Sequence, residues 1–208
     1  MPFQLNQEKG EFLIRLARKA LTKYLQTNKC ISVPEETPKK LLECCGVFIT
    51  INSVEKGKKD LRGCIGFPYP TNPLAEAVIQ ASISSGTQDP RFDSISLDEL
   101  SNVIFEVSVL TPPEKISVSK AKDYIKSVMV GQDGLIIERG MCKGLLLPQV
   151  PVEWQWNEEE FLCQCCIKAG LPPDSWLIEG TKVYKFQAII FEEEEPNGNI
   201  KRLSIDRK

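Results

Sequence analysis

The sequence predicts an α+β fold, because its expected strands pair with neighbours along the chain while helices interrupt them at irregular intervals. The regular alternation of strand and helix that builds a doubly wound parallel sheet is missing. With 208 residues, of which 42% are hydrophobic and 26% charged, the chain is long enough to bury a sizeable core. We therefore expect antiparallel sheets flanked by helices.

In the first half of the chain, apolar periodicity and turn residues mark each expected element. The side chain of Asn6 can cap a helix, and the proline at position 73 suits the first turn of another. The expected elements are a helix from Asn6 to about Leu25, a hairpin of strands 47–51 and 61–67 joined by the charged turn 55–60, a helix from Pro73 to about Gly86, a capping box at 96–99 and a strand over 102–110.

Glycine, proline and a second capping box divide the other half of the chain. The expected elements are a short helix over 118–126, a hairpin of strands 128–130 and 135–138, a third strand over 144–147, a helix from Asn157 to about Ala169 and a strand over 183–191. We assign residues 6–193 to one domain and residues 194–208 to a charged C-terminal tail.

Charge and composition narrow the classes of function. A net charge of −2 argues against nucleic-acid binding over the whole surface, although residues 1–70 carry 12 basic against 7 acidic side chains. Such a basic stretch either meets an acidic partner or forms a solvated helix face. The chain has no histidine, so Ser–His and Cys–His catalytic pairs and imidazole zinc ligands are excluded. No window reaches the roughly 18 apolar residues of a membrane span and no signal sequence is recognisable, so we expect a cytoplasmic protein.

The strongest candidate site is the run 61–66, in which Cys64 lies between two glycines and follows Arg62 by two positions. Gly63 and Gly66 have no side chain, so a substrate could approach the backbone there. Arg62 offers a cation that would lower the pKa of the Cys64 thiol and hold an anionic group. The same pattern also fits a buried strand cysteine, and both interpretations remain open.

Three further side chains are candidates for the same site. Asp89 and Arg91 lie in a polar, proline-containing loop that either holds a substrate or ties itself down by salt bridges. Glu106 alternates with apolar residues on a strand and is a candidate buried carboxylate, for which Arg62 or Arg91 would be the partner. In a protein without histidine, Asp89 or Glu106 would orient or deprotonate the Cys64 thiol, and Arg91 would bind the substrate.

Cys163 and Cys166 are three residues apart on an expected helix and could share a metal ion with Cys44 and Cys45. This spacing matches no standard zinc or iron–sulfur motif, so core packing is the favoured interpretation and we expect no metal site. The glycine pairs of the chain form no phosphate-binding or dinucleotide-binding fingerprint, so we expect no cofactor.

Several blocks of the chain resemble the AMMECR domain family, beginning with Leu61-Arg62-Gly63-Cys64-Ile65-Gly66. The later blocks are Asp89-Pro90-Arg91-Phe92, residues 105–112, residues 131–135, residues 146–150, Trp156-Asn157 and Lys168-Ala169-Gly170. The resemblance extends from about Asn6 to Glu193 and is strongest with the archaeal branch. It implies a stand-alone α+β protein in which a larger and a smaller subdomain form one compact unit around antiparallel sheets. It also implies a functional link to radical-SAM and Memo-like proteins.

Two hypotheses about function follow. In the first, the chain is an enzyme that acts on a small anionic substrate, with Cys64 as its nucleophile or redox thiol. In the second, it is a non-catalytic module that binds a partner protein or RNA, and the Arg-Gly-Cys block is architectural. RNA binding through the basic first third would depend steeply on salt, but the scarcity of aromatic residues there argues against it.

Overall fold

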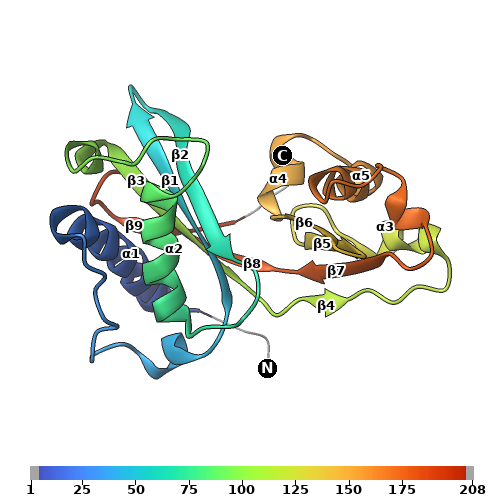
Figure 1. Cartoon of the computed structure of the whole chain (residues 1–208), viewed down its shortest axis with the longest axis horizontal. Coiled ribbons are helices and arrows are strands. Elements are labelled where there is room, and N and C mark those ends of the chain that lie inside the picture. Colours follow the sequence, from blue (N-terminus) through green and yellow to red (C-terminus); the bar gives the residue numbers. More distant parts are fainter. Residues whose placement is uncertain (1–4, 205–208) are drawn as a thin grey trace. The chain divides into compact units, whose positions relative to one another are not determined.

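The computed structural model describes residues 5–204 and divides the chain into two compact units (Figure 1). The first unit contains the residues up to Leu110 together with Ile189–Leu203, and the second contains Thr111–Ala188. Each unit has its own sheet and its own hydrophobic core. The α+β class is therefore confirmed. No helix in this described part of the chain combines the length and the apolar character needed to cross a bilayer.

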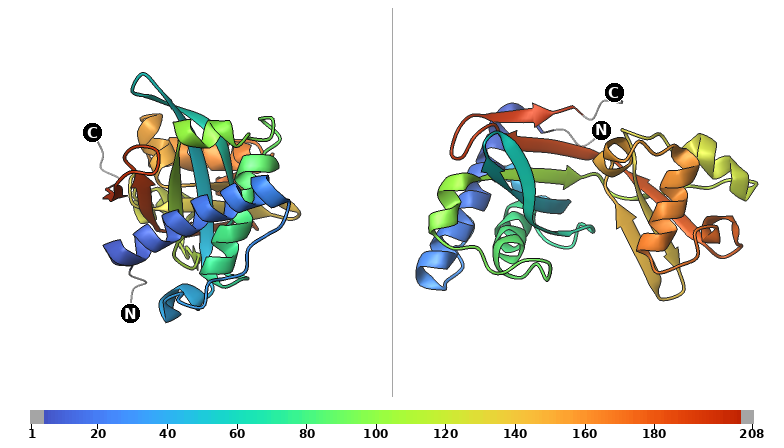
Figure 2. Two further views of the ribbon diagram at one scale, coloured as in Figure 1. Left: turned by 90° about the vertical axis from the view of Figure 1, so that its left-hand side faces the viewer. Right: turned by 90° about the horizontal axis from the view of Figure 1, so that it is seen from above.

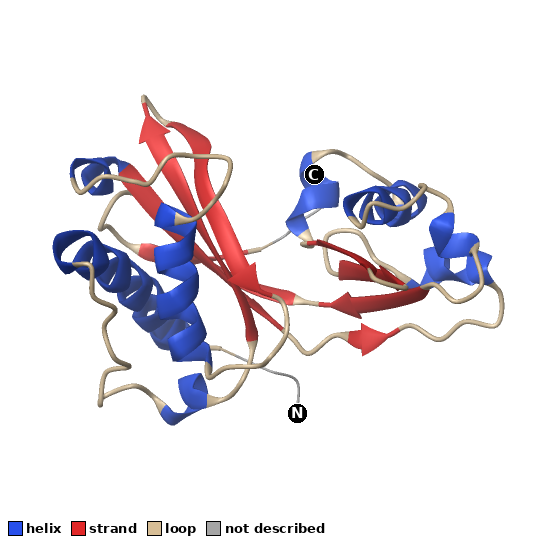
Figure 3. Ribbon diagram, in the orientation of Figure 1, coloured by secondary structure: helices blue, strands red, loops and turns tan. Residues whose placement is uncertain are grey.

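The first unit is a five-stranded sheet in the order β2-β1-β3-β8-β9, with its two long helices on one face (Figure 3). Its elements are α1 (Gln7–Thr27), the 3-10 helix η1 (Lys39–Leu42), β1 (Gly46–Glu55), β2 (Lys58–Phe67), α2 (Leu74–Thr87), the 3-10 helix η2 (Asp98–Asn102), β3 (Val103–Leu110), β8 (Ala188–Glu193) and β9 (Ile200–Leu203). Val47, Ile49 and Ile51 of β1 are fully buried in one core with apolar residues of α1 and α2. Since side chains alternate along a strand, Thr50 points to the opposite face of the sheet.

Local signals set the ends of the elements in this unit, and the caps at Asn6 and at residues 96–99 and the turn at Gly57 are the predicted ones. The Asn6 side chain accepts a backbone N–H of the first turn of α1 at 3.2 Å, and Asn28 ends the helix in the left-handed region. Ser96 and Glu99 form the reciprocal bonds of a capping box before η2. The hairpin of β1 and β2 turns at Lys56-Gly57, where both residues have positive φ.

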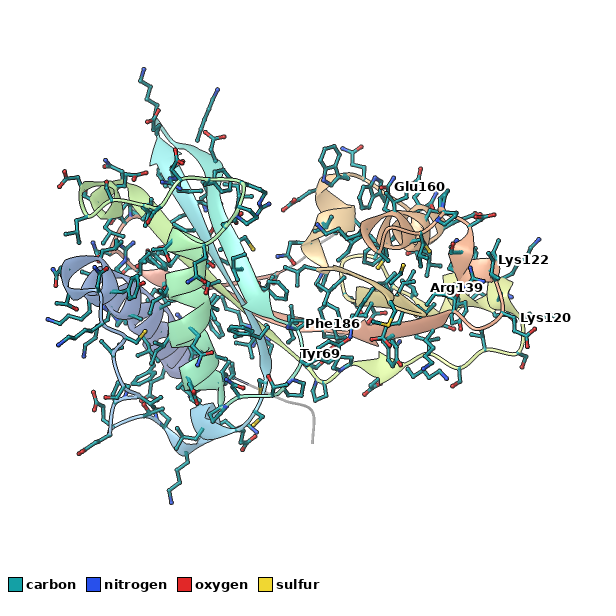
Figure 4. All side chains as sticks on the ribbon, in the orientation of Figure 1. Tyr69, Lys120, Lys122, Arg139, Glu160 and Phe186 are labelled. Atoms are coloured by element: carbon teal, nitrogen blue, oxygen red, sulfur yellow. The ribbon has the colours of Figure 1, made fainter. Side chains whose placement is uncertain are left out.

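The second unit is a four-stranded sheet in the order β4-β7-β5-β6 with short helices around it. Its elements are β4 (Glu114–Lys115), the 3-10 helix η3 (Ala121–Asp123), α3 (Tyr124–Ser127), β5 (Gly134–Arg139), β6 (Cys142–Leu146), α4 (Gln149–Glu153), α5 (Glu158–Lys168), the 3-10 helix η4 (Ser175–Leu177) and β7 (Lys182–Phe186). Asn157 and Glu160 form the predicted capping box of α5, and Glu160 is labelled in Figure 4. On β7, Phe186 lies across from Gly134, where an added Cβ would fall 2.3 Å from its ring.

The hairpin predicted from residues 128–130 and 135–138 is wrong. The Asp133 carboxylate accepts the Met129 N–H at 3.0 Å, and the Asp133 N–H donates to the Met129 carbonyl at 2.9 Å. These bonds close residues 129–133 into a turn, so the segment before them forms no strand. The hairpin consists instead of β5 and β6, and it turns at Gly140, which has a φ of +60°.

The single strand predicted over residues 183–191 is two strands that belong to different sheets, β7 and β8. Between them Gln187 exchanges two hydrogen bonds with Thr111, which replace the ladder of either sheet. The predicted charged tail over residues 194–208 contains a further strand, β9, which pairs with β8 and which the sequence pattern did not indicate. The last four residues of that tail lie outside the described part of the chain.

Candidate functional site

Cys64 lies on β2, at one edge of the five-stranded sheet, just beyond a β-bulge. The register between β1 and β2 shifts by one residue between Ile51 and Asn52, which leaves Arg62 as the extra residue of the bulge. Past the bulge Cys64 pairs with Thr50, and the Thr50 hydroxyl lies 3.2 Å from the Cys64 sulfur. The thiol therefore lies on the face of the sheet away from α1 and α2, as Thr50 does.

Glu106 lies in the same row across the strands. It pairs with Thr50 in the register of β1 and β3, so Cys64, Thr50 and Glu106 follow one another over three strands. Glu106 is half-buried, and the Ser108 hydroxyl donates a hydrogen bond to its carboxylate at 3.2 Å. The sequence predicted the face of Glu106 correctly, but it did not indicate that Thr50 lies between Glu106 and Cys64.

Burial raises the pKa of the half-buried Cys64 thiol, and the nearby negative charge of Glu106 raises it further. The Thr50 hydroxyl and the Arg91 charge act in the opposite direction but do not reverse the shift. The expectation that Arg62 lowers the pKa of Cys64 is therefore wrong. At neutral pH the thiol is protonated, which is the less reactive form.

Asp89 and Arg91 clamp the backbone of Cys64. The Cys64 N–H donates to the Asp89 carboxylate at 2.8 Å, and Arg91 donates to the Cys64 carbonyl at 3.4 Å. Arg91 also donates two side-chain hydrogen bonds to Asp89, at 2.9 and 2.7 Å. These bonds hold the pKa of Asp89 well below its usual range, although the residue is only 4% exposed. Asp89 is thus a fixed acceptor for an edge-strand N–H rather than a poised base.

Arg62 is held away from the thiol by a different set of contacts. Its Nε donates to the Glu99 carboxylate at 2.9 Å, and its Nη1 donates to the Asp93 carbonyl at 2.8 Å. The Arg62 guanidinium also lies 5.9 Å from the centre of the Phe92 ring, a cation–π distance. The pair lowers the pKa of Glu99. Arg62 therefore joins β2 to the segment before β3, and Glu99, which the sequence marked only as a capping residue, is its partner.

The glycines of the block make room for neighbours within the fold. A Cβ on Gly63 would fall 2.1 Å from the Ser85 carbonyl oxygen of α2. A Cβ on Gly66 would fall 2.3 Å from the Val47 carbonyl oxygen and 2.4 Å from the Phe48 ring. The close approach that we expected from a substrate is made at both positions by the protein itself.

Ser85 is a residue of this site that the sequence analysis missed. Its hydroxyl accepts the Ile65 N–H at 2.8 Å and donates to the Ile49 carbonyl at 2.8 Å, and the residue is 1% exposed. Ser85 continues the apolar stripe of α2, one helical turn after Ala81. A polar residue at the next position of a buried stripe was the signal that could have identified it.

The cysteines of α5 belong to the core of the second unit. Cys165 and Cys166 are fully buried, and burial raises the pKa of Cys165 to about 12 and that of Cys166 to about 11. Within residues 5–204 no group of three or more Cys, Asp or Glu side chains is arranged to hold a metal ion. These positions favour the core-packing interpretation of residues 163–166.

Comparison with known proteins gives consistent matches over nearly the whole chain. The AMMECR1 family model matches residues 14–191. Protein PH0010 of Pyrococcus horikoshii is 56% identical over 97% of this chain and 98% of the relative, and Protein MJ0810 of Methanocaldococcus jannaschii is 49% identical over 94% and 96%. The crystal structure of Protein PH0010 superposes with a TM-score of 0.91 and covers 96% of this chain and 98% of that one. The two folds are therefore closely similar.

Proposed function

This chain belongs to the AMMECR1 family, and we propose that it is a non-catalytic binding module in which the Arg-Gly-Cys block is architectural. One observation carries the proposal: both backbone groups of Cys64 are bound by the Asp89–Arg91 pair. An edge strand with free N–H and C=O groups invites pairing with another chain, and this clamp satisfies them internally. The Arg-Gly-Cys block then serves to attach β2 to the loop after α2.

The other polar groups of the predicted site support the same proposal. Arg62 is engaged by Glu99 and by the Asp93 carbonyl, and the pKa of the Cys64 thiol is raised rather than lowered. A thiol enzyme needs a thiolate, and a side chain that binds an anion needs donors that are not already occupied. The protein partners that the family resemblance proposes for such a module are radical-SAM and Memo-like proteins.

A thiol enzyme acting on an anionic substrate is the second candidate, and one observation favours it. Cys64, Thr50 and Glu106 form a row on one face of the sheet, with a hydroxyl between a thiol and a carboxylate. If Glu106 accepted a proton through Thr50, Cys64 would become a nucleophile without any histidine.

The rate of alkylation of each cysteine in the folded protein separates the two candidates. Iodoacetamide labelling between pH 6 and 9.5, read by peptide mass spectrometry, compares Cys64 with the exposed Cys30 and with Cys142, another half-buried strand cysteine. A binding module predicts that Cys64 reacts more slowly than Cys30, with a midpoint above the ordinary thiol value of about 8.5. Labelling of Cys64 at least ten times faster than Cys142 at pH 7 would overturn the proposal in favour of the enzyme.

A further inference from the structure

A groove with a volume of about 400 Å³ lies in the first unit, between the second half of α1 and the turn that joins β8 to β9. In Figure 2 these segments are blue and red, and α1 also contacts β9. Arg15, Lys19 and Lys23 line the groove from the helix, and Asn197 and Gly198 line it from the turn. Its volume lies in the range of small-molecule sites, roughly 300–1,000 Å³.

A neutral, fully bonded ion pair forms the deeper part of this groove. Arg18 donates two hydrogen bonds to the Glu193 carboxylate and one each to the carbonyls of Leu100 and Val103. Glu193 also accepts the Phe105 N–H at 3.0 Å. Because these groups satisfy one another, Glu193 does not offset the cations above it. Arg18 supports the groove and is not itself the group that would bind a ligand.

Three cations in the groove are exposed and uncommitted. Arg15, Lys19 and Lys23 recur every four residues on one face of α1, so their backbone positions are about 6 Å apart and span about 12 Å. None of the three is paired with a carboxylate within the described chain. With the Arg18–Glu193 pair neutral, the groove carries three positive charges, which are costly to hold close together without an anion.

We propose that this groove binds a triphosphate group, either free or carried by a nucleotide. Three cations on successive turns of one helix face carry long side chains that can converge on a compact chain of three phosphates, and the arginine adds a planar fork that can bind one phosphate through two bonds. Gln26 and Asn197 add side-chain amides at the same groove. No aromatic side chain of the described residues lines the groove, so it offers no aromatic platform for single-stranded bases, and a small polyanion fits it better than RNA.

Isothermal titration in magnesium-free buffer tests this proposal with three probes: tripolyphosphate, ATP and AMP. We expect tripolyphosphate and ATP to bind at least ten times more tightly than AMP, and several-fold less tightly when NaCl rises from 50 to 200 mM. If ATP binds more than three-fold tighter than tripolyphosphate, the triphosphate comes from a nucleotide, and if their affinities are equal, the free chain is recognised. If neither tripolyphosphate nor ATP binds, or if an RNA oligonucleotide without a 5′ phosphate binds more tightly than both, the proposal is overturned.

Two triple variants show where the probe binds. The variant R15Q/K19Q/K23Q should bind tripolyphosphate at least ten-fold more weakly than the natural chain. The variant K39Q/K56Q/K58Q removes the same charge from exposed positions of the first unit outside the groove, and its affinity should change less than two-fold. Equal losses in both variants would mean that net charge, and not the groove, attracts the anion, which would also overturn the proposal. Cys64→Ser should bind normally, so failure here is distinct from failure of the proposed function.

Discussion

The β2 edge of the five-stranded sheet and its β8–β9 side differ in whether their charged side chains are paired within the protein. At the β2 edge, other groups of the protein occupy the polar groups of the conspicuous sequence block. The Asp89–Arg91 pair binds the Cys64 backbone, and Glu99 binds Arg62. On the side of β8 and β9, an unremarkable helix presents three cations that have no protein partner within residues 5–204. The comparison teaches that the position of a recognisable motif and the position of free binding capacity need not coincide.

Each side also contains an arginine paired with a buried carboxylate, and these two pairs differ in the exposure of the arginine. The Arg18 and Glu193 side chains are 11% and 3% exposed, whereas the Arg91 side chain is 53% exposed over a buried Asp89. Water screens a charge that it can reach, so the loss of Arg91 leaves a carboxylate that solvent can approach. The loss of Arg18 leaves a carboxylate whose side chain is only 3% exposed at the bottom of the groove, where water screens it less, and we expect the two sides to respond differently to mutation.

Removing Arg18 should strongly destabilise the β8–β9 side of the sheet. Arg18→Met leaves the Glu193 carboxylate buried without its cation, and breaking a buried pair in this way costs about 3–5 kcal/mol of unfolding free energy. Urea unfolding followed by circular dichroism measures this cost. Arg15→Met, on the same helix but exposed, is the matched control and should change the free energy of unfolding by less than about 0.5 kcal/mol. Equal effects would mean that the Arg18 pair does not stabilise this side of the sheet.

A side chain at Gly63 should destabilise the packing of the β2 edge against α2. Gly63→Ala would bring a methyl group against the backbone carbonyl of Ser85 in the middle of the packing between β2 and α2. Because a backbone oxygen cannot move aside as a side chain can, we expect a loss of about 1–3 kcal/mol in unfolding free energy. Gly57→Asn, at a positive-φ turn position with open space around it, is the control and should be nearly neutral. A neutral Gly63→Ala would show that this edge is loosely packed.

The predictions that held depended on signals within a few residues. Asn6 and Asn157 cap their helices, the β1–β2 hairpin forms across its glycine turn, and the alternation of residues 103–110 places Glu106 on the predicted face. Each of these signals acts through a backbone bond or a side-chain period that is complete in the local sequence. Such elements can be identified without knowing the rest of the fold.

Apart from the hairpin predicted at 128–138, which a local turn at 129–133 replaces, the predictions that failed concern contacts between distant segments. Apolar residues recur at every second position from Tyr184 to Ile190, and the change of sheet at Gln187 depends on its bonds to Thr111. Arg62 was expected to act on Cys64, two residues away, but it bonds to Glu99, 37 residues away. The glycines gave no indication whether a ligand or Ser85 and Phe48 would occupy the space beside them. The contacts of the candidate residues thus depended on partners that only the fold brings near.

The smallest expected effect concerns the pH dependence of the clamp on Cys64. The pKa of Asp89 is lowered in the folded protein, so its contribution to stability is complete above the unfolded value of about 4 and is lost as the pH falls towards the folded value. Asp89→Asn removes this contribution and should cost about 1 kcal/mol at pH 7, but progressively less between pH 4 and pH 2. Thermal unfolding across that pH range measures how the difference in stability between Asp89→Asn and the natural chain narrows. Asp60→Asn, an exposed carboxylate on the same strand, should follow the natural chain at every pH. A constant difference between Asp89→Asn and the natural chain would mean that shape, and not charge, holds the β2 edge closed.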